Sequence, residues 1–460
     1  MSRTLAFSGV LHAKAAAHLL PKDGCEAAAI LLCSMGHGSD ANMLVRDVLP
    51  VPHDECPVRR SDFIVWPGQR LSDAQYRAEQ EGLTLVLIHS HPGGFFDFSE
   101  ADDASDGVVV RHLFDGWCGS VPAVIGSAVM VPGGAIRARY YSQGGEWHNM
   151  NVRIAGSDIL HYRPGSREAS RPMAFGDGMS LELRRRTACI IGVSGTGSIT
   201  AEQAARLGFG RIILIDFDRI ERKNLNRILN STLADAAGGL LKVEMFEKAI
   251  VTYRDDVEVI AISDTILSRE AVIAASQADV IFSCVDSSEG RQIADLIAQA
   301  YLIPLIDMGV TIPTRRTVDG KPAVADVLGR IDYVQPGRSS LGSRGVYTPE
   351  SLRAEYLERV APEAHADEVA EGYIRGTHTE APGVIALNMR AASGAMLEYV
   401  ARAFPFRHEP NENYARITFS MAEMEEDHFA EGHFDAARSS VLGIGAMEPL
   451  LGLPSLGLGG

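Results

Sequence analysis

Between Thr187 and Val285, short apolar runs rich in β-branched residues alternate with segments of helical periodicity. This alternation constrains the fold more than any other feature, because strands separated by helices run parallel and are covered by helices on both faces. We therefore predict a doubly wound, Rossmann-like parallel sheet with its ligand at the carboxyl ends of the strands. The predicted strands are 188–193, 211–216, 257–262 and 280–285, and the predicted helices are 199–207, 241–253 and 269–277.

The first strand of this region leads into a glycine-rich turn, Gly192-Val-Ser-Gly195-Thr-Gly197. Small residues let the backbone approach a phosphate chain, and the following helix offers its N-terminal amides. Asp216 ends the next strand, where a carboxylate accepts hydrogen bonds from ribose hydroxyls. These features suit ATP or a dinucleotide, although Ser194 replaces the second glycine of the usual dinucleotide fingerprint.

Polar residues beyond Asp216 favour ATP. Asn224 and Arg227 follow it closely, Lys242 comes next, and Asp286 ends a later strand. A triphosphate requires cations, together with a carboxylate that holds Mg²⁺, whereas a dehydrogenase does not need this set. An NAD-dependent oxidoreductase fused to a second domain stays open as an alternative, since the glycine turn and Asp216 would also suit it.

A second group of candidate site residues lies earlier in the chain. The apolar run 83–88 predicts a buried strand, and His89 and His91 lie at its carboxyl end. Ser99 is placed as the N-cap of a following helix, so Asp102 falls in its first turn. Two imidazoles and a carboxylate are three ligands for one zinc ion, with the fourth position open for water. A capping box explains Ser99 and Asp102 equally well, but it does not explain two histidines at a strand end.

The spacing His-x-His-x7-Ser-x-x-Asp resembles the signature of the JAB/MPN (JAMM) metalloproteases, which cut after the C-terminal glycines of ubiquitin-like proteins. The resemblance implies an N-terminal α+β domain in which His89, His91 and Asp102 bind Zn²⁺. It assigns Glu26, directly before the apolar run 27–33, to general acid/base work, and Ser99 to stabilising the oxyanion. Zinc lowers the pKa of its water to about 7, which makes a nearby carboxylate an effective proton acceptor.

The stretch Asp216-Phe-Asp218, followed by Asn224-Leu-Asn226-Arg227, resembles the ThiF/MoeB-type adenylyltransferases related to ubiquitin-activating enzymes. The resemblance implies that Asp216 binds ribose, that Asp286 holds Mg²⁺, and that the carboxylate of a terminal Gly-Gly is adenylated. It places ATP on the glycine turn, its phosphates being held by Asn224, Arg227 and Lys242. It also points to Arg171 as an arginine supplied across a homodimer.

The sequence departs from this family in its cysteines. Relatives commonly carry a thioester-forming cysteine and zinc-binding cysteine pairs downstream, yet no cysteine follows Cys284, and the segment 336–343 contains serines instead. Serine offers no thiolate near neutral pH and is a poor zinc ligand. A thioester relay is therefore not expected. The segment 380–388 and the Ala-rich helix that follows, to Ala403, resemble the closing helix of the activating domains.

Length and composition indicate the number of domains, the classes of partner and the compartment. A chain of 460 residues is expected to form two or three domains. We predict a JAB/MPN-like domain at 1–150, a linker at 151–175, an adenylyltransferase domain at 176–405 and an acidic, then Gly-rich, extension at 406–460. The net charge of -16 argues against nucleic acid or an anionic membrane as partner. Six scattered cysteines, with no signal peptide or spanning segment, favour a reducing cytoplasm.

The two resemblances together predict a bifunctional enzyme of a bacterial ubiquitin-like or sulfur-carrier pathway. One half would cleave after a Gly-Gly tail and the other would adenylate the exposed carboxylate. The second alternative is a zinc peptidase whose nucleotide domain binds ATP or the modifier without chemistry. The acidic segment around His428 and His433 is expected to be a solvated surface. The terminal Gly459-Gly460 is expected to be a flexible end rather than a site of self-processing.

Overall fold

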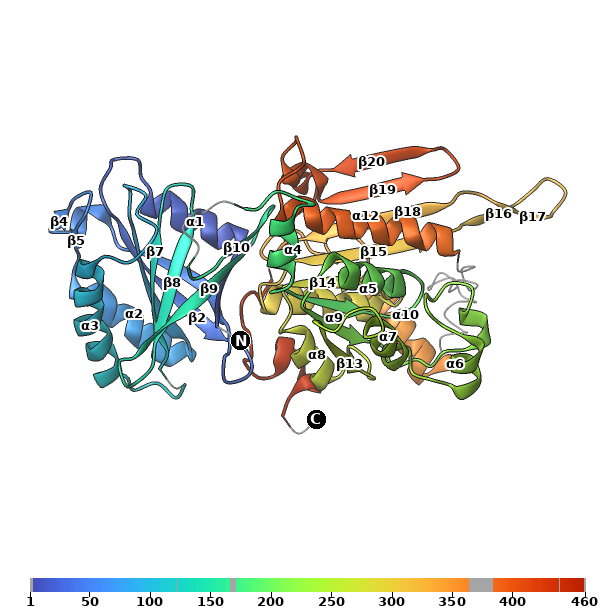
Figure 1. Cartoon of the computed structure of the whole chain (residues 1–460), viewed down its shortest axis with the longest axis horizontal. Coiled ribbons are helices and arrows are strands. Elements are labelled where there is room, and N and C mark those ends of the chain that lie inside the picture. The colour runs from blue at the N-terminus through green and yellow to red at the C-terminus, as the bar shows by residue number, and fades with distance from the viewer. Residues whose placement is uncertain (1–2, 122, 166–170, 364–383, 438, 459–460) are drawn as a thin grey trace. The chain divides into compact units, whose positions relative to one another are not determined.

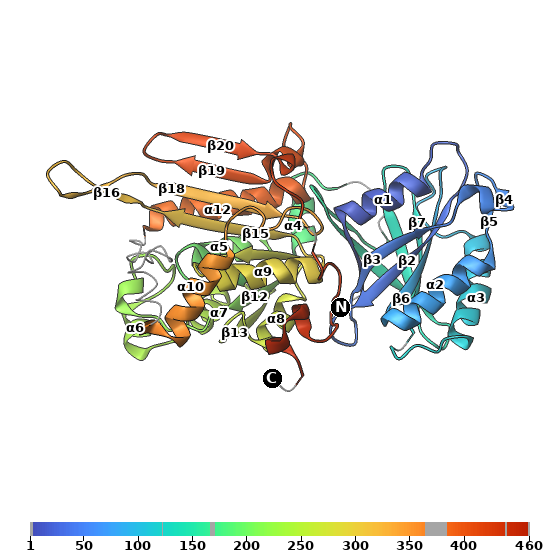
Figure 2. The ribbon, with the colours of Figure 1, turned by 180° about the vertical axis from the view of Figure 1, so that it is seen from behind.

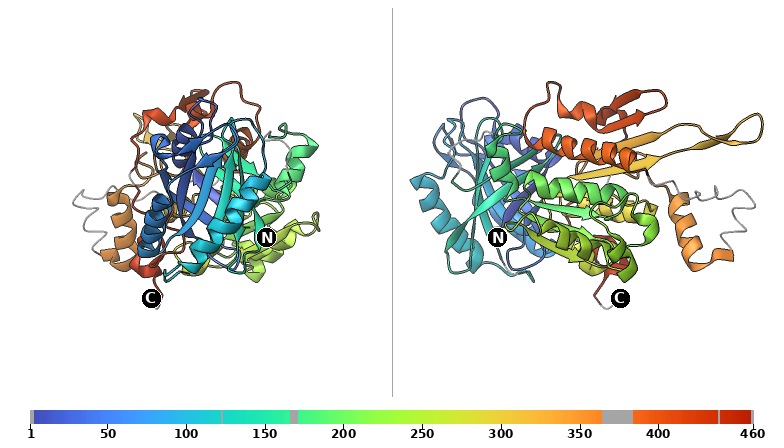
Figure 3. Two further views of the ribbon diagram at one scale, coloured as in Figure 1. Left: turned by 90° about the vertical axis from the view of Figure 1, so that its left-hand side faces the viewer. Right: turned by 45° about the vertical axis from the view of Figure 1, so that its right-hand side comes forward.

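The computed structural model describes residues 3–121, 123–165, 171–363, 384–437 and 439–458. The chain divides into two compact units (Figure 1). Unit 1 comprises Met1–Arg171, Gln299–Leu302 and Ser439–Gly460, and unit 2 comprises Pro172–Ala298 and Ile303–Arg438. Figures 2 and 3 show the same elements from behind and from the sides.

Unit 1 is built on a mixed sheet with the strand order β1-β3-β2-β6-β7-β8-β9-β10. Strand β9 pairs with β8 through residues 147–150 and with β1 through residues 151–155, so the sheet curls round to join its first strand. The strands are β1 (Thr4–Ser8), β2 (Ala28–Met35), β3 (Met43–Pro50), β6 (Thr84–Ser90), β7 (Ile125–Met130), β8 (Ile136–Tyr141), β9 (Trp147–Ala155) and β10 (Ile159–Tyr162). A small ladder joins β4 (Val58–Arg59) and β5 (Ile64–Val65).

Helices cover both faces of this sheet. One core cluster contains Ala15 and Leu19 of α1 (Gly9–Leu19), and a second contains residues of α2 (Gly68–Glu81) and α3 (Glu100–Asp115). The α+β domain expected from the zinc motif is therefore confirmed. Ser99 caps α3, and a full capping box with Asp102 is present, as the sequence predicts.

The expected linker at 151–175 is wrong in its first half. Residues up to Tyr162 form most of β9 and all of β10, and Val152 and Ile154 lie in the core of unit 1. A fully buried arginine, Arg153, interrupts the apolar pattern of this strand. Because burial of a charged residue breaks the alternation on which strand prediction depends, the segment resembled a polar connection.

Unit 2 contains the predicted parallel sheet, in the order β13-β12-β11-β14-β15-β18-β19-β20. The first five strands run parallel, which confirms the Rossmann-like fold, and β18, β19 and β20 continue the sheet antiparallel. Its strands are β11 (Thr187–Ile191), β12 (Arg211–Ile215), β13 (Glu258–Ile262), β14 (Val280–Ser283), β15 (Leu305–Thr311), β18 (Leu328–Val334), β19 (Arg416–Ser420) and β20 (Glu425–Phe429). A separate hairpin pairs β16 (Thr314–Arg316) with β17 (Pro322–Val324).

The helices of unit 2 include each one predicted from the alternation. They are α4 (Asp177–Leu183), α5 (Gly195–Leu207), α6 (Leu233–Gly238), α7 (Lys242–Ile250), α8 (Arg269–Ala275), α9 (Ser288–Ala300), α10 (Pro349–Val360) and α12 (Ile385–Ala403). The last residues of α9, from Gln299, are grouped with unit 1. Within the described ranges, no helix is long and apolar enough to cross a membrane.

The expected extension at 406–460 is also wrong as a separate segment. Strands β19 and β20 belong to the sheet of unit 2, whereas residues from Ser439 onward are grouped with unit 1. The neighbouring strands carry fully buried charges, Asp307 on β15 and Asp332 on β18, each paired with Arg330. Because charged residues interrupt the apolar alternation by which strands are recognised, the antiparallel part of the sheet was not predicted. The terminal Gly459-Gly460 lies outside the described residues.

Candidate zinc and nucleotide sites

The two histidines and the aspartate of the zinc motif converge at the end of β6. His89 Nε2 lies 3.0 Å from Asp102 Oδ1, and His91 Nε2 lies 3.3 Å from Asp102 Oδ2. The three ligand atoms lie within 4.8 Å of one another. Two imidazoles and one carboxylate fit a zinc site that keeps an open position, so the donor set is compatible with Zn²⁺.

Strand pairing brings Glu26 to the same place. Strands β2 and β6 are antiparallel with Ala28 opposite His89, a register that carries Glu26 toward His91 just beyond the strand ends. The backbone of Ala27 is tied to Ser90 by hydrogen bonds that fix this approach. Glu26 Oε1 lies 4.0 Å from His91 Nε2, and the residue is 5% exposed. The position expected for the acid/base carboxylate is therefore occupied.

Hydrogen bonds orient the histidine and aspartate side chains. His91 Nδ1 lies 2.9 Å from the carbonyl oxygen of Phe95, a contact that leaves Nε2 available to a metal. The Ser99 hydroxyl donates to Asp102 Oδ2 at 2.8 Å, and the Ser99 backbone N–H donates to the same oxygen. Ser99 therefore contacts a ligand residue directly, and its role at the oxyanion stays a prediction.

Burial and charge shift the titration of this cluster. Burial raises the pKa of the Glu26 carboxyl, although His89 and His91 oppose this effect. Burial acts in the same direction on Asp102, but hydrogen bonds from the two histidines outweigh it and hold the pKa of Asp102 well below its usual range. A carboxyl with a raised pKa next to one that stays ionised suits a proton acceptor beside a metal ligand.

A groove that the sequence did not predict opens beside the triad. Its volume is about 590 Å³, and its lining includes Glu26, His89 and Asp102. Apolar side chains from the β4–β5 ladder, α2 and α3 form its other walls: Phe63, Ile64, Val65, Trp66, Leu71 and Val109. The groove is large enough for a short extended peptide. Its residues come from five separate segments of the chain, so no local sequence motif predicts it.

The glycine turn of unit 2 has the tight geometry that the sequence predicts. Gly192 has φ +86°, a conformation that favours glycine. A Cβ atom on Gly197 would lie only 1.7 Å from the carbonyl oxygen of Gly192, so no side chain fits there. Helix α5 begins at Gly195 and is thirteen residues long, and its first amides face the end of β11. This arrangement can hold phosphate groups.

Asp216 and Lys242 lie together at the end of β12. Asp216 accepts hydrogen bonds from the backbone N–H groups of Val193 and Asp218. Lys242 Nζ lies 2.5 Å from Asp218 Oδ2 and 3.7 Å from Asp216 Oδ1. Burial raises the pKa of the Asp216 carboxyl, while Lys242 and the two N–H donors oppose this effect. The structure therefore brings Asp216 to the turn and shows Lys242 paired with carboxylates.

Asn224 and Arg227 both follow β12, but their side chains make different contacts. Asn224 is buried, and its side-chain oxygen accepts from the Glu221 backbone N–H, so it organises the loop after β12. Arg227 donates to the Lys223 carbonyl and to Asn226 Oδ1. No carboxylate pairs with Arg227 within the part of the chain that the structure describes, so its guanidinium is available to an anion.

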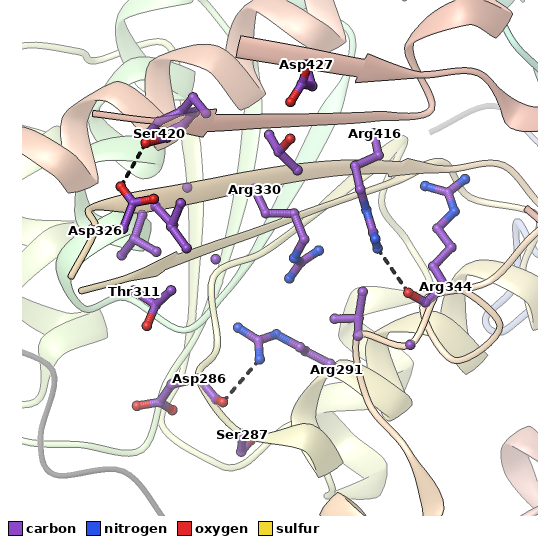
Figure 4. A pocket seen from close by; sticks show the side chains of 18 of the residues that line it. Asp286, Ser287, Arg291, Thr311, Asp326, Arg330, Arg344, Arg416, Ser420 and Asp427 are labelled. Atoms are coloured by element: carbon purple, nitrogen blue, oxygen red, sulfur yellow. Dashed lines mark hydrogen bonds between the residues drawn. The ribbon is translucent and has the colours of Figure 1, made fainter. Parts of the chain in front are cut away.

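Asp286 lies in an open position beyond β14. Its backbone oxygen accepts from Arg291, and its carboxylate has no partner among the described residues (Figure 4). It borders a cavity of about 1150 Å³ that the sequence did not predict. Arginines line this cavity, among them Arg291, Arg330 and Arg416, as do carboxylates of β20 and its neighbours. A single exposed carboxylate next to a phosphate-binding turn suits Mg²⁺, which takes the rest of its ligands from phosphates and water.

Arg171, expected to act across a dimer, belongs to unit 1. Its Nη2 lies 3.0 Å from Asp158 Oδ2. The structure shows this ion pair within unit 1, and the role of Arg171 across a homodimer stays a prediction.

Two family models match the chain. Residues 9–140 match the model described as prokaryotic homologs of the JAB domain, and residues 167–341 match the ThiF family. The second match supports the adenylyltransferase hypothesis over the NAD-dependent alternative. Together the two matches confirm the combination of domains predicted from the motifs.

Curated relatives match a part of the chain. Ubiquitin-like modifier-activating enzyme 5 of Drosophila willistoni is 28% identical over 167 residues, which cover 34% of this chain and 37% of the relative. The enzyme of the same name from Caenorhabditis elegans is 27% identical over 169 residues, again covering 34% and 37%. The chain therefore spans well under half the length of these relatives.

Solved structures of Escherichia coli MccB are similar at a lower level. MccB with ATP has a TM-score of 0.43 and 18% identity, covering 57% of this chain and 68% of that chain. The microcin C7 biosynthetic enzyme MccB in complex with N-formylated MccA has a TM-score of 0.44 and 18% identity, covering 57% and 69%.

Proposed function

Because this chain joins a prokaryotic JAB-type domain to a ThiF-family domain, we propose that it is a bifunctional enzyme of a ubiquitin-like modifier pathway. Unit 1 cleaves a peptide or isopeptide bond after a Gly-Gly tail, and unit 2 adenylates the exposed glycine carboxylate. The observation that carries the proposal is the presence of both sites in one chain. A hydrolase that exposes a terminal carboxylate supplies the nucleophile that an adenylating enzyme consumes.

In unit 1, His89, His91 and Asp102 are the residues that hold Zn²⁺. The ion supplies Lewis acidity and a water molecule with a pKa of about 7. Glu26 takes up a proton at its carboxylate and returns it to the leaving amine, a role for which its raised pKa is suited. The adjacent groove holds the extended tail, with its apolar walls excluding water from the reacting bond.

In unit 2, the turn between Gly192 and Gly197 holds the phosphates of ATP, Asp216 holds the ribose, and Asp286 binds Mg²⁺. Arg227 neutralises phosphate charge, and Lys242 and Asn224 complete the pocket. The terminal carboxylate of the modifier attacks the α-phosphate, the bond to the β-phosphate breaks, and pyrophosphate leaves. Positioning and charge neutralisation supply most of the acceleration.

The partner in this proposal is a ubiquitin-like or sulfur-carrier protein that ends in Gly-Gly. Two observations support it: the relatives of unit 2 are named ubiquitin-like modifier-activating enzymes, and a large cavity borders Asp286. Arg291, Arg330 and Arg416 lie on the walls of this cavity (Figure 4), where ion pairs with Asp307 and Asp332 hold them in place. Activation ends at the adenylate or passes to an external thiol, since Cys284 is the last cysteine.

Pyrophosphate exchange tests the adenylation half. With ATP, Mg²⁺ and a modifier that ends in Gly-Gly, the wild-type protein exchanges labelled pyrophosphate into ATP. Asp286→Ala reduces the exchange at least about a hundredfold, because the charge of the leaving pyrophosphate is no longer neutralised. Asp319→Ala, at the tip of the exposed β16–β17 hairpin, is the matched control. Full exchange in Asp286→Ala contradicts the assignment, and ATP binding without any exchange by the wild type favours a purely binding domain.

Cleavage of a Gly-Gly fusion tests the hydrolase half. Glu26→Gln keeps the volume of the side chain and removes its basicity, so cleavage falls by about a hundredfold or more while the zinc content is unchanged. Glu146→Gln, exposed in the β8–β9 turn, is the control. A chelator abolishes activity in the wild type. Undiminished cleavage in Glu26→Gln rules out its role as acid and base.

We further propose that unit 2 forms a homodimer. Four large apolar side chains are exposed just before α4, on α4 and just after α12: Met173, Phe175, Leu181 and Phe406. The rings of Phe175 and Phe406 lie 5.3 Å apart, which makes one apolar surface. Light scattering of the wild type is expected to give a dimer mass, and Phe175→Asp a monomer mass with an unchanged melting temperature. A wild type that is monomeric at all concentrations contradicts this interface.

The setting we propose is the cytoplasm of a prokaryote. All six cysteines are free in the structure, which suits a reducing compartment, and the matched JAB model describes prokaryotic homologs.

A further inference from the structure

Asn388 is a buried polar residue that none of the roles above uses. It lies in the first turn of α12 and is only 5% exposed. Its backbone N–H is bonded within the helix, but its side-chain amide makes no hydrogen bond within the described residues. The residue as a whole is buried, but its amide atoms keep contact with solvent, so the unpaired carboxamide is available to a ligand.

The amide lies directly against the phosphate-binding turn. A Cβ atom built on Gly195 would lie 2.4 Å from Asn388 Nδ2 and 3.6 Å from Arg227 Cδ. The carboxamide and the arginine stem therefore flank the same side of Gly195, the first residue of α5. A glycine at this position allows both side chains to approach the helix N-terminus.

Packing between two helices holds Asn388 in this position. Helix α12 runs along α5, and Gln203 Nε2 of α5 donates to Ser393 Oγ of α12 at 2.7 Å. Ala391, Ala392 and Ala395 of α12 are fully buried, so the two backbones are held close by small residues. The amide is thus carried by a rigid element rather than by a loop.

The surroundings select the ligand chemistry. The amides at the start of α5 attract anions, as does the Arg227 guanidinium, which has no carboxylate partner among the described residues. A carboxamide donates to an anion without adding charge. We propose that Asn388 Nδ2 donates a hydrogen bond to a phosphate oxygen of ATP held at the Gly192–Gly197 turn, beside Arg227. This inference rests on the proposed nucleotide site. It adds to that site a residue of α12, which is distant from the glycine turn in sequence.

Calorimetric titration with the Mg²⁺ complex of a non-hydrolysable ATP analogue tests the proposal. Loss of a hydrogen bond to a charged group weakens binding about tenfold in Asn388→Ala, and like-charge repulsion weakens it about a hundredfold in Asn388→Asp. Leu397→Ala, at an exposed position of the same helix, binds within about twofold of the wild type. Adenosine, which lacks phosphate, binds the wild type and Asn388→Ala equally.

The outcomes separate this inference from the proposed function. Absence of analogue binding by the wild type overturns the nucleotide site itself. Binding by the wild type together with unchanged affinity in Asn388→Ala overturns the role of Asn388 alone. Preserved affinity in Asn388→Asp also overturns it, because the side chain would then accept from the amides of α5. Asn388→Leu keeps the packing volume, so a loss of affinity without a lower melting temperature in this variant supports the proposal.

Discussion

Asp295, a residue with no role in either proposed reaction, is a buried carboxyl whose pKa is shifted. It lies on α9, is 2% exposed, and accepts a hydrogen bond from the Tyr347 hydroxyl at 2.9 Å. Its Oδ1 has no partner in the described part of the chain. Burial raises the pKa of Asp295 from 3.8 to about 6, against the opposing effect of its hydrogen-bond donors. Folding therefore stabilises the protonated form of the Asp295 carboxyl relative to its ionised form.

Because of this raised pKa, the ionisation of Asp295 makes the free energy of unfolding depend on pH. Because the folded pKa lies above the unfolded value, the folded state binds the proton more tightly, and stability falls as the pH rises through about 4 to 6. Asn at this position does not ionise. The free energy of unfolding of Asp295→Asn, relative to the wild type, should therefore rise by about 2 to 3 kcal/mol between pH 4 and pH 8. Urea titrations at both pH values measure it, and a difference independent of pH would contradict the shift.

Residue-scale prediction succeeded where the geometry is local. His89, His91 and Asp102 are separated by one strand end and one helix cap, so their spacing was sufficient to bring them together. Glu26 requires the register that places Ala28 opposite His89, and only the family resemblance pointed to it. Asn388 could not be predicted, because its place depends on the packing of α12 against α5, which no local pattern records.

At the scale of elements, α5 and α3 each contain a glycine whose replacement by alanine is expected to change stability, in opposite directions at the two positions. A Cβ on Gly197 would lie 1.7 Å from the Gly192 carbonyl oxygen, so Gly197→Ala forces the turn apart. Its free energy of unfolding should fall by at least about 2 kcal/mol, and nucleotide binding should be lost. Gly107, exposed in the middle of α3, has nothing within 4 Å of its Cβ position. Gly107→Ala should gain about 0.5 to 1 kcal/mol.

Urea unfolding followed by circular dichroism compares the two variants under one condition. Since both replace a helical glycine by alanine, intrinsic helix propensity acts alike on them, and the opposite signs isolate the steric conflict at the turn. A Gly197→Ala protein as stable as Gly107→Ala would mean that the turn is not as closely packed as described.

The elements that the sequence predicted share one property, an uninterrupted apolar pattern. Strands β11, β12, β13 and β14 were predicted within a few residues, because their side chains are almost wholly apolar. Strand β18 was missed since the partly exposed Arg330 and the fully buried Asp332 form an ion pair in it. In the segment after β18, Ser340 and Ser343 bond to each other, and Ser339 bonds to Glu431. Hydrogen bonds thus organise the segment in which relatives would show paired cysteines.

For the molecule as a whole, we propose that the two units act in sequence on one Gly-Gly tail. Only a free terminal carboxylate attacks the α-phosphate of ATP, since an amide carbonyl is too poor a nucleophile. A modifier precursor with residues beyond Gly-Gly must therefore be cleaved in unit 1 before unit 2 can adenylate it. This order makes the hydrolase residue Glu26 necessary for adenylation of a precursor and irrelevant to adenylation of the mature form.

Pyrophosphate exchange with both forms of the modifier measures this dependence. Wild-type protein should support exchange with the precursor after a lag, and with the mature form at once. Glu26→Gln should lower exchange with the precursor by about a hundredfold or more, the loss expected for cleavage itself, and leave exchange with the mature form unchanged. Asp286→Ala should abolish both. Exchange of the precursor at the wild-type rate in Glu26→Gln would show that unit 2 does not depend on the product of unit 1.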